Sequence, residues 1–151
     1  MAIDACLVDT NILLRMTRQS DAEHTLVKNS LTGLVSQGTL LFFTHQNIAE
    51  LWNAMTRPRE RNGLGLSISE AEREVEAIED GMILLPDNES VYREWRRLVV
   101  QYAIYGVQVH DARLAAAMYV HRIGHLLTLN VADFSRFPGL TVLHPASVPE
   151  S

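Results

Sequence analysis

Four acidic side chains have sequence positions from which they could do chemistry together. They are Asp9, Glu50, Asp111 and Asp133. Two unit charges about 4 Å apart repel by roughly 4 kcal/mol at an effective dielectric near 20, so converging carboxylates either take up protons or hold a cation. A site made only of acidic oxygens suits Mg²⁺ or Mn²⁺ and not Zn²⁺. A divalent ion would bind a substrate phosphate and lower the pKa of a water. The set therefore predicts metal-dependent hydrolysis of phosphodiesters.

Each carboxylate also has an ordinary structural interpretation. Aspartate is a favoured helix N-cap, so Asp9 and Asp111 fit caps as well as they fit metal ligands. Glu50 shares the polar arc of its predicted helix with Gln46, which is typical of a solvated face. Asp133 lies in a polar turn, where aspartate is common without any function. The four together carry the hypothesis, and no single position does.

Apolar, β-rich stretches alternate with helical patterns along the chain. The predicted strands are Ala5–Val8, Leu40–Thr44, Met82–Leu85, Leu126–Leu129 and Leu140–Leu143. The predicted helices are Ala22–Val35, His45–Thr56, Ser69–Asp80, Glu89–Tyr105 and Val109–His121, with a loop at Arg57–Gly63. Ser69 and Glu72 have the spacing of a capping box at the start of the third helix.

The alternation predicts an α/β fold with a mostly parallel central sheet and helices on both faces. In such sheets the ligand crevice lies outside the carboxyl ends of the strands. That rule places a site near Asp9, Thr44–His45 and Thr128–Asn130. The length of 151 residues is enough for one domain with a real core, so we expect a single domain over residues 1–151.

Four segments carry an ordered motif: Leu7–Leu14, Ile48–Glu50, His110–Ala117 and Leu127–Phe134. In this order and spacing, over nearly all of the chain, they resemble PIN-domain ribonucleases, specifically VapC-type toxins. The resemblance implies a three-layer α/β/α sandwich and a magnesium-dependent endoribonuclease, with Mn²⁺ as an alternative ion. It also implies a homodimer that cleaves RNA and is inhibited by a cognate VapB-type antitoxin.

The resemblance assigns roles to individual residues. Asp9, Glu50, Asp111 and Asp133 match the acidic metal-binding set, Thr10 and Asn11 match the polar residues beside the first carboxylate, and Thr128 and Asn130 match the hydrogen-bonding pair of the last motif. It implies that Asp9 and Asp111 bind the ion directly or through water. Glu50 and Asp133 would complete the site or orient the attacking water. One departure is Leu129, which stands where the family usually has a basic residue. One contact to phosphate or antitoxin is therefore missing or supplied elsewhere.

Basic and aromatic side chains offer further contacts. Arg57, Arg59 and Arg61 follow the helix that carries Glu50, and we expect them beside the acidic cleft. They fit a clamp for RNA phosphates or antitoxin acids, and they fit a solvated charge run equally well. We interpret Tyr92 and Trp95 as part of the core, with a stacking platform as the alternative.

Composition narrows the setting. The formal charge of -5 argues against a general polyanion binder, although not against an enzyme that touches a few phosphates. No apolar run approaches the roughly 18 residues of a membrane span, and the first residues lack the pattern of a secretory signal. The lone Cys6 has no partner for an internal disulfide, as expected in a reducing cytoplasm.

Two other classes of function remain open at this stage. One is another metal-dependent phosphohydrolase, such as an aspartyl-phosphate phosphatase, which uses the Asp after the first strand as its nucleophile. It usually has a second Asp two residues on, where this chain has Asn11, and a catalytic lysine, whereas the sole Lys28 lies far from every predicted strand end. A binding module that kept the fold without catalysis would predict a broken acidic set, yet all four positions are acidic.

Overall fold

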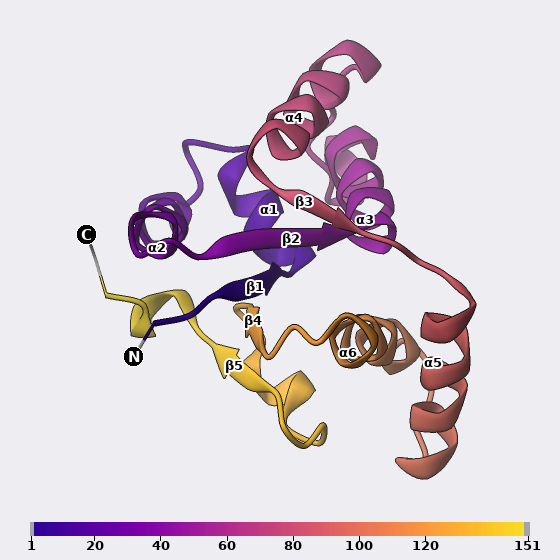
Figure 1. Ribbon diagram of the computed structural model, residues 1–151. Helices are drawn as coiled ribbons and strands as arrows, with labels where there is room; N and C mark the ends of the chain where they lie inside the picture. Colours follow the sequence, from indigo (N-terminus) through magenta and orange to yellow (C-terminus); the bar gives the residue numbers. More distant parts are fainter. Residues whose placement is uncertain (1, 150–151) are drawn as a thin grey trace.

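The computed structural model describes residues 2–149 and contains one sheet of five strands in the order β3-β2-β1-β4-β5 (Figure 1). The strands are β1 (Ala5–Val8), β2 (Leu40–Thr44), β3 (Ile83–Leu85), β4 (His125–Leu127) and β5 (Thr141–Leu143). Every neighbouring pair is parallel. The sheet is therefore wholly parallel, and the C-terminal ends of all five strands lie along the same edge.

Helices cover both faces of this sheet. They are α1 (Thr10–Met16), α2 (His24–Ser36), α3 (His45–Thr56), α4 (Ile68–Gly81), α5 (Glu89–Gln101) and α6 (Gln108–His121). Three short 3-10 helices accompany them: η1 (Arg59–Arg61), η2 (Val131–Phe134) and η3 (Pro145–Ser147). None of the helices in the described residues is long and apolar enough to cross a membrane.

The alternation of side chains along β1 explains the three layers. Cys6 and Val8 point into a core shared with α1, α2, α3 and α4, whereas Leu7 points into a second core with α5 and α6. All three side chains are fully buried, as expected for a strand at the centre of a parallel sheet. The expected α/β/α sandwich is confirmed, and Cys6 is a small buried side chain within it.

Two local predictions were wrong. Helix α1 was not predicted, because the chain turns directly from β1 into a helix of only seven residues. The capping box of α4 is formed by Ser67 and Glu70, not by Ser69 and Glu72. The Ser-x-x-Glu spacing occurs twice in this stretch, and the extended backbone of Ser67 starts the helix at the first occurrence.

The ends of other elements also differ from the predicted bounds. Helix α5 ends at Gln101 rather than near Gly106, because Ala103 already adopts a positive φ of 48° and breaks the helical path. Strand β4 ends at Leu127, two residues earlier than predicted. The residues after it, beginning with Thr128, turn their polar groups toward the end of β1.

Candidate active site

The ends of β1 and β4 bring the first and last motifs into contact. Val8 pairs with Leu127 in the sheet, and the backbone N–H of Asp9 donates to the carbonyl oxygen of Leu127 at 3.0 Å. Immediately beyond, the hydroxyl of Thr128 donates to Oδ2 of Asp9 at 2.8 Å. The strand register therefore places Asp9 and Thr128 side by side at the carboxyl edge of the sheet.

Asp9 is both a helix cap and part of the site. Its Oδ1 accepts a hydrogen bond of 2.7 Å from the backbone N–H of Thr10, which caps α1. Its Oδ2 faces Thr128 instead. Asp9 is buried, with only 7% of its surface exposed to solvent. The cap and the contact to Thr128 use different oxygens of one carboxylate, so capping of α1 does not exclude Asp9 from the network at the sheet edge.

Asn11 ties the start of α1 to the segment after β4. Its Oδ1 accepts from the backbone N–H of Leu129 at 3.1 Å, and its Nδ2 donates to Oγ1 of Thr128 at 3.2 Å. The backbone N–H of Asn130 also donates to that hydroxyl oxygen, at 3.0 Å. Thr128 and Asn130 are thus joined by a hydrogen bond whose donor is the backbone of Asn130 and whose acceptor is the side chain of Thr128.

Glu50 joins the same network from α3. The hydroxyl of Thr10 donates to Oε1 of Glu50 at 2.9 Å, and Nδ2 of Asn47 donates to the oxygen of that hydroxyl at 3.1 Å. Asn47 is fully buried and forms a capping box with Thr44. Sequence reasoning missed Asn47, although the Thr-x-x-Asn spacing before the helix is a recognisable capping pattern.

Gln46 connects α3 to the start of α6, which carries Asp111. Its Nε2 donates to the backbone carbonyl of His110 at 2.9 Å and approaches Oε1 of Glu50 at 3.5 Å. Residues of the two helices line an open cavity of about 450 Å³, together with Arg113. Gln46 was not singled out in the sequence, because a glutamine on a polar helix face gives no local signal of a contact to another helix.

Asp111 lies within the electrostatic field of the other three carboxylates. Burial raises its pKa most, and repulsion from Asp9, Asp133 and Glu50 raises it further, to about 7. Asp111 is the fourth residue of α6, and Val107 occupies the N-cap position, so Asp111 is not a helix cap. Asp111 is therefore affected by the charges of the other three carboxylates in addition to its burial.

Asp133 and Asp9 complete this picture. Asp133 is exposed on η2, whose position is fixed by the buried ring of Phe134. Burial raises the pKa of Asp9, hydrogen bonds from Thr128 and Thr10 oppose that rise, and the charges of Glu50 and Asp133 add to it. The network thus holds the Asp9 carboxylate in place while its surroundings disfavour its negative charge.

The donor chemistry of this site fits a hard divalent cation. In residues 2–149 none of the four carboxylates forms an ion pair with a basic side chain, and Arg136 is the one basic residue that lowers the pKa of Asp111. Within the same described range, no three acidic, histidine or cysteine side chains lie close enough to enclose a metal ion by themselves. Mg²⁺ commonly takes one or two carboxylates and completes its shell with water and substrate phosphate, so an open acidic edge suits it.

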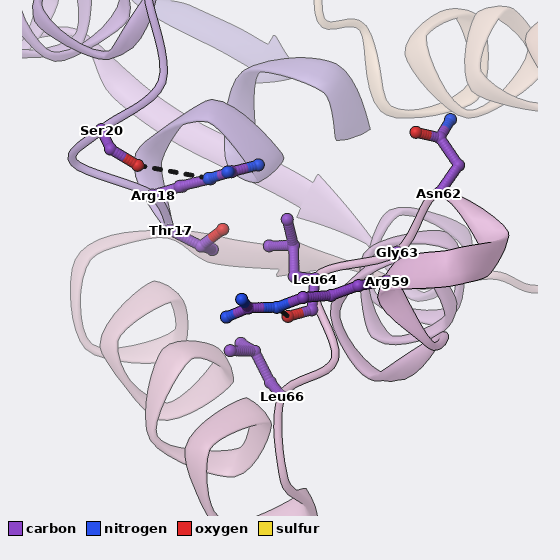
Figure 2. Close-up of a pocket in the computed structure, with 8 residues that line it drawn as sticks. All are labelled: Thr17, Arg18, Ser20, Arg59, Asn62, Gly63, Leu64 and Leu66. Atoms are coloured by element: carbon purple, nitrogen blue, oxygen red, sulfur yellow. Dashed lines mark hydrogen bonds between the residues drawn. The ribbon is translucent and has the colours of Figure 1, made fainter.

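The arginine loop lies at the opposite end of α3 from Gln46. Arg57 caps the C-terminus of that helix, roughly 10 Å along its axis from Glu50 at 1.5 Å per residue. Figure 2 shows Arg59 and Arg18 extending toward the same space, with Leu64 beside Arg59. These residues line a cavity of about 590 Å³ that shares no residue with the cavity beside Glu50.

Comparison with known proteins adds a family and a set of similar structures. The profile of the PIN domain matches residues 6–140. Among solved structures, VapBC2 from Rickettsia felis bound to a promoter DNA fragment has a TM-score of 0.68 at 15% identity, covering 93% of this chain and 98% of that one. VapBC-1 from nontypeable Haemophilus influenzae has a TM-score of 0.67 at 17% identity, covering 95% and 99%.

A third similar structure is described by its activity. VapC20 from Mycobacterium tuberculosis, a toxin that cleaves the sarcin–ricin loop, has a TM-score of 0.58 at 16% identity, covering 80% of this chain and 86% of that one. No curated protein sequence matches the chain significantly. At these identities the structural likeness concerns the fold, whereas the profile match concerns the sequence itself.

Proposed function

The chain belongs to the PIN-domain family, and from that premise we propose that it is the toxin of a toxin–antitoxin pair, acting as a magnesium-dependent endoribonuclease. The observation that carries the proposal is the placement of Asp9, Glu50, Asp111 and Asp133 around one edge of the sheet, where the neighbouring carboxylates add to the raised pKa of Asp9 and of Asp111. Among the described residues none of these carboxylates forms an ion pair, and a site that concentrates unpaired negative charge favours a cation.

Each residue of the network has a task in this proposal. Asp9 and Asp111 would hold the ion, directly or through water, and Glu50 and Asp133 would complete its surroundings or orient the attacking water. When bound, Mg²⁺ or Mn²⁺ would supply a water of lowered pKa and stabilise the negative charge that develops on the phosphate. Thr128 and Thr10 fix Asp9 and Glu50 through hydrogen bonds of 2.8 and 2.9 Å, so these carboxylates are oriented before substrate arrives.

The partners follow from the same proposal. The substrate is RNA, and the inhibitor is a VapB-type antitoxin, since several similar structures are toxin–antitoxin complexes, including one from Klebsiella pneumoniae. We assign Arg57, Arg59 and Arg61 to antitoxin or RNA contact, with Arg59 and Arg18 presenting two guanidinium groups in one cavity. We further propose a homodimer in the cytoplasm, where the buried Cys6 thiol stays reduced.

The phosphatase alternative loses support from the role of Asn11. Its carboxamide oxygen accepts from Leu129 and its nitrogen donates to Thr128, so Asn11 links α1 to the segment after β4. The phosphatase mechanism would need a second carboxylic acid at this position. Lys28 lies on the exposed face of α2, on a helix that precedes β2, and not at the carboxyl edge of the sheet.

The decisive experiment is Asp9→Asn. Asparagine still accepts the hydrogen bond from Thr10 and caps nearly as well, so the fold should persist. The rate of RNA cleavage should fall by more than about 100-fold, since even the outer partners of metal ligands are worth 10- to 100-fold. Expression of the parent chain should arrest growth and fragment RNA, and a co-expressed candidate antitoxin should relieve both effects.

Asp4→Asn is the matched control, because it removes the same charge from an exposed residue just before β1. It should behave like the parent. An Asp9→Asn protein that cleaves RNA and arrests growth at the parent level would contradict the proposed site.

A further inference from the structure

Two aromatic rings on α5 line a cavity beside the candidate active site. Tyr92 and Trp95 face a space of about 520 Å³ whose walls also include Val91 and Val109. Tyr92 is 52% exposed, so a large part of its ring is open to a ligand. The prediction that both rings belong to the core is therefore only partly right. Trp95 packs partly against the core, but both rings also line the cavity, as a stacking platform would.

The platform is held in place before any ligand binds. The indole Nε1 of Trp95 donates a 2.8 Å hydrogen bond to the carbonyl oxygen of Val109 on α6. The ring centres of Tyr92 and Trp95 are 6.3 Å apart, and Nη1 of Arg96 donates to the hydroxyl of Tyr92 at 3.2 Å. Fixed aromatic rings lose little conformational freedom when a planar group stacks on them.

This cavity borders the cavity beside Glu50, with which it shares two lining residues. His110 and Arg113 line it, and the same two residues line the cavity that contains Glu50. The carbonyl of His110 is bound by Gln46 of α3, and the next residue is Asp111. A polymer that lies across the acidic edge would therefore pass His110 and Arg113 on its way to the aromatic cavity.

The charges around the cavity favour an uncharged occupant. Arg113 forms an ion pair with Asp87, and Arg93 forms one with Glu89. These pairs leave the rim rich in hydrogen-bonding groups but without excess positive charge to attract a phosphate. An aromatic wall with a neutral polar rim matches the flat face and the polar edge of a nucleobase.

We propose that this aromatic subsite, formed by Tyr92, Trp95, Val109 and Arg113, binds an unpaired nucleobase of the RNA next to the bond that is cleaved. The base stacks on the ring of Tyr92, while the sugar–phosphate chain passes His110 toward the acidic edge. The inference rests on the proposed ribonuclease function. It adds that α5 contacts a base of the substrate and sets the preference among bases.

The test measures binding without cleavage. Labelled single-stranded RNA hexamers of A, C, G or U are titrated with the protein in EDTA, and fluorescence anisotropy gives Kd. Tyr92→Ala should raise the Kd of the preferred hexamer about tenfold, the typical contribution of one stacked base. Tyr92→Phe should stay near the parent value. Tyr105→Ala is the matched control, because Tyr105 is a more exposed aromatic residue, at 81%, that lines none of these cavities.

Abasic hexamers test the contact directly. Removal of one base should weaken binding to the parent at a single position, and Tyr92→Ala should lose nothing more at that position, because the two changes delete the same contact. Additive losses at every position would overturn the inference. So would an unchanged Kd for Tyr92→Ala, or a conversion of dimer to monomer by Tyr92→Ala in sedimentation, which would assign this face to a second copy of the chain.

Failure of the proposed function has a different signature. If the parent protein neither binds these hexamers nor cleaves RNA with Mg²⁺, both proposals fall. If the parent binds and cleaves RNA while Tyr92→Ala keeps its Kd, its KM and its base preference, the subsite alone is refuted.

Discussion

The hydroxyl of Thr128 donates a 2.8 Å hydrogen bond to Oδ2 of Asp9, across 119 positions of sequence. Thr128 is fully buried and at the same time accepts hydrogen bonds from Asn11 and from the backbone N–H of Asn130. One hydroxyl therefore fixes a carboxylate of the candidate site and closes the segment that leads to Asp133. It also opposes the rise that burial causes in the pKa of Asp9.

Thr128→Val tests this relationship, because valine keeps the shape and removes the hydroxyl. Two donors lose their acceptor, so the free energy of unfolding should fall by about 1–3 kcal/mol. Cleavage should slow by about 10- to 100-fold, as for other partners that orient metal ligands. The pKa of Asp9 should rise, which moves the acid limb of the pH–rate profile to higher pH.

Thr141→Val on exposed β5 serves as its control, since Thr141 makes no side-chain hydrogen bond among those of the described residues. A Thr128→Val enzyme with the parent rate and pH profile would show that the hydroxyl is only structural.

Asp111 gives a prediction about stability and pH. Its pKa is raised from 3.8 to about 7 in the folded protein, so the folded state binds more protons than the unfolded state between these values. This contribution to stability is full below about pH 4 and is lost as the pH rises through about 7. Asp111→Asn should therefore be more stable than the parent at pH 8, by about 1 kcal/mol or about 3 °C in Tm after solvent screening, and similar to it near pH 4.

Thermal unfolding from pH 4 to 8, without divalent ions, makes the measurement. Asp4→Asn provides the comparison for a lost charge at the surface. If the difference between Asp111→Asn and the parent is the same at both ends of this range, the carboxylates do not interact as described.

The metal requirement can be measured by activity and by stability. RNA cleavage should require Mg²⁺ or Mn²⁺, excess EDTA should abolish it, and Zn²⁺ should not restore it fully. Mg²⁺ should raise Tm more at pH 8 than at pH 5.5, because protons compete for Asp111 below its pKa of about 7. Cleavage that continues in EDTA would indicate chemistry by side chains alone.

The arginine loop predicts a separable effect on binding. Replacement of Arg57, Arg59 and Arg61 by alanine should weaken antitoxin or RNA binding and leave the fold intact. Because Arg59 faces the cavity with Arg18 and not the one with Glu50, antitoxin rescue of growth should suffer more than cleavage of free RNA. Lys28→Ala removes a charge from exposed α2 and should change neither. Unchanged rescue and unchanged RNA binding would leave the loop as a solvated face.

The sequence predicted the elements whose signals are local. The bounds of β1, β2 and α3 were predicted to the residue, because dense apolar runs and a uniform helical stripe specify them without help from distant contacts. Helix α1 was not predicted, because a helix of seven residues repeats its apolar pattern too few times for the helical period to be recognised in the sequence. The cavity that Arg59 shares with Thr17 and Arg18 was not predicted either, because Thr17 and Arg18 follow the end of α1.

Within the candidate site, residue types were visible and connections were not. The four carboxylates stood out by type and by position after strands. Asn47 and Gln46 did not, because their importance lies in hydrogen bonds to Thr10 and to the carbonyl of His110, which only the packing of α3 against its neighbours creates. Glu50 illustrates the same limit: an exposed glutamate on a polar arc looks solvated until Thr10 is seen to donate to it.

The place of β1 between β2 and β4 has a consequence for how the protein is made. Strands β1 and β2 are synthesised early, whereas β4 at His125–Leu127 is the fourth strand to be made and Thr128 follows Asp9 by 119 residues. Until then Asp9 has no hydroxyl to hold it and no neighbouring strand on that side. A nascent chain that ends before β4 therefore has an incomplete candidate site. In the proposed function, cleavage of RNA would therefore begin only after residues 125–128 have been synthesised and have folded against β1.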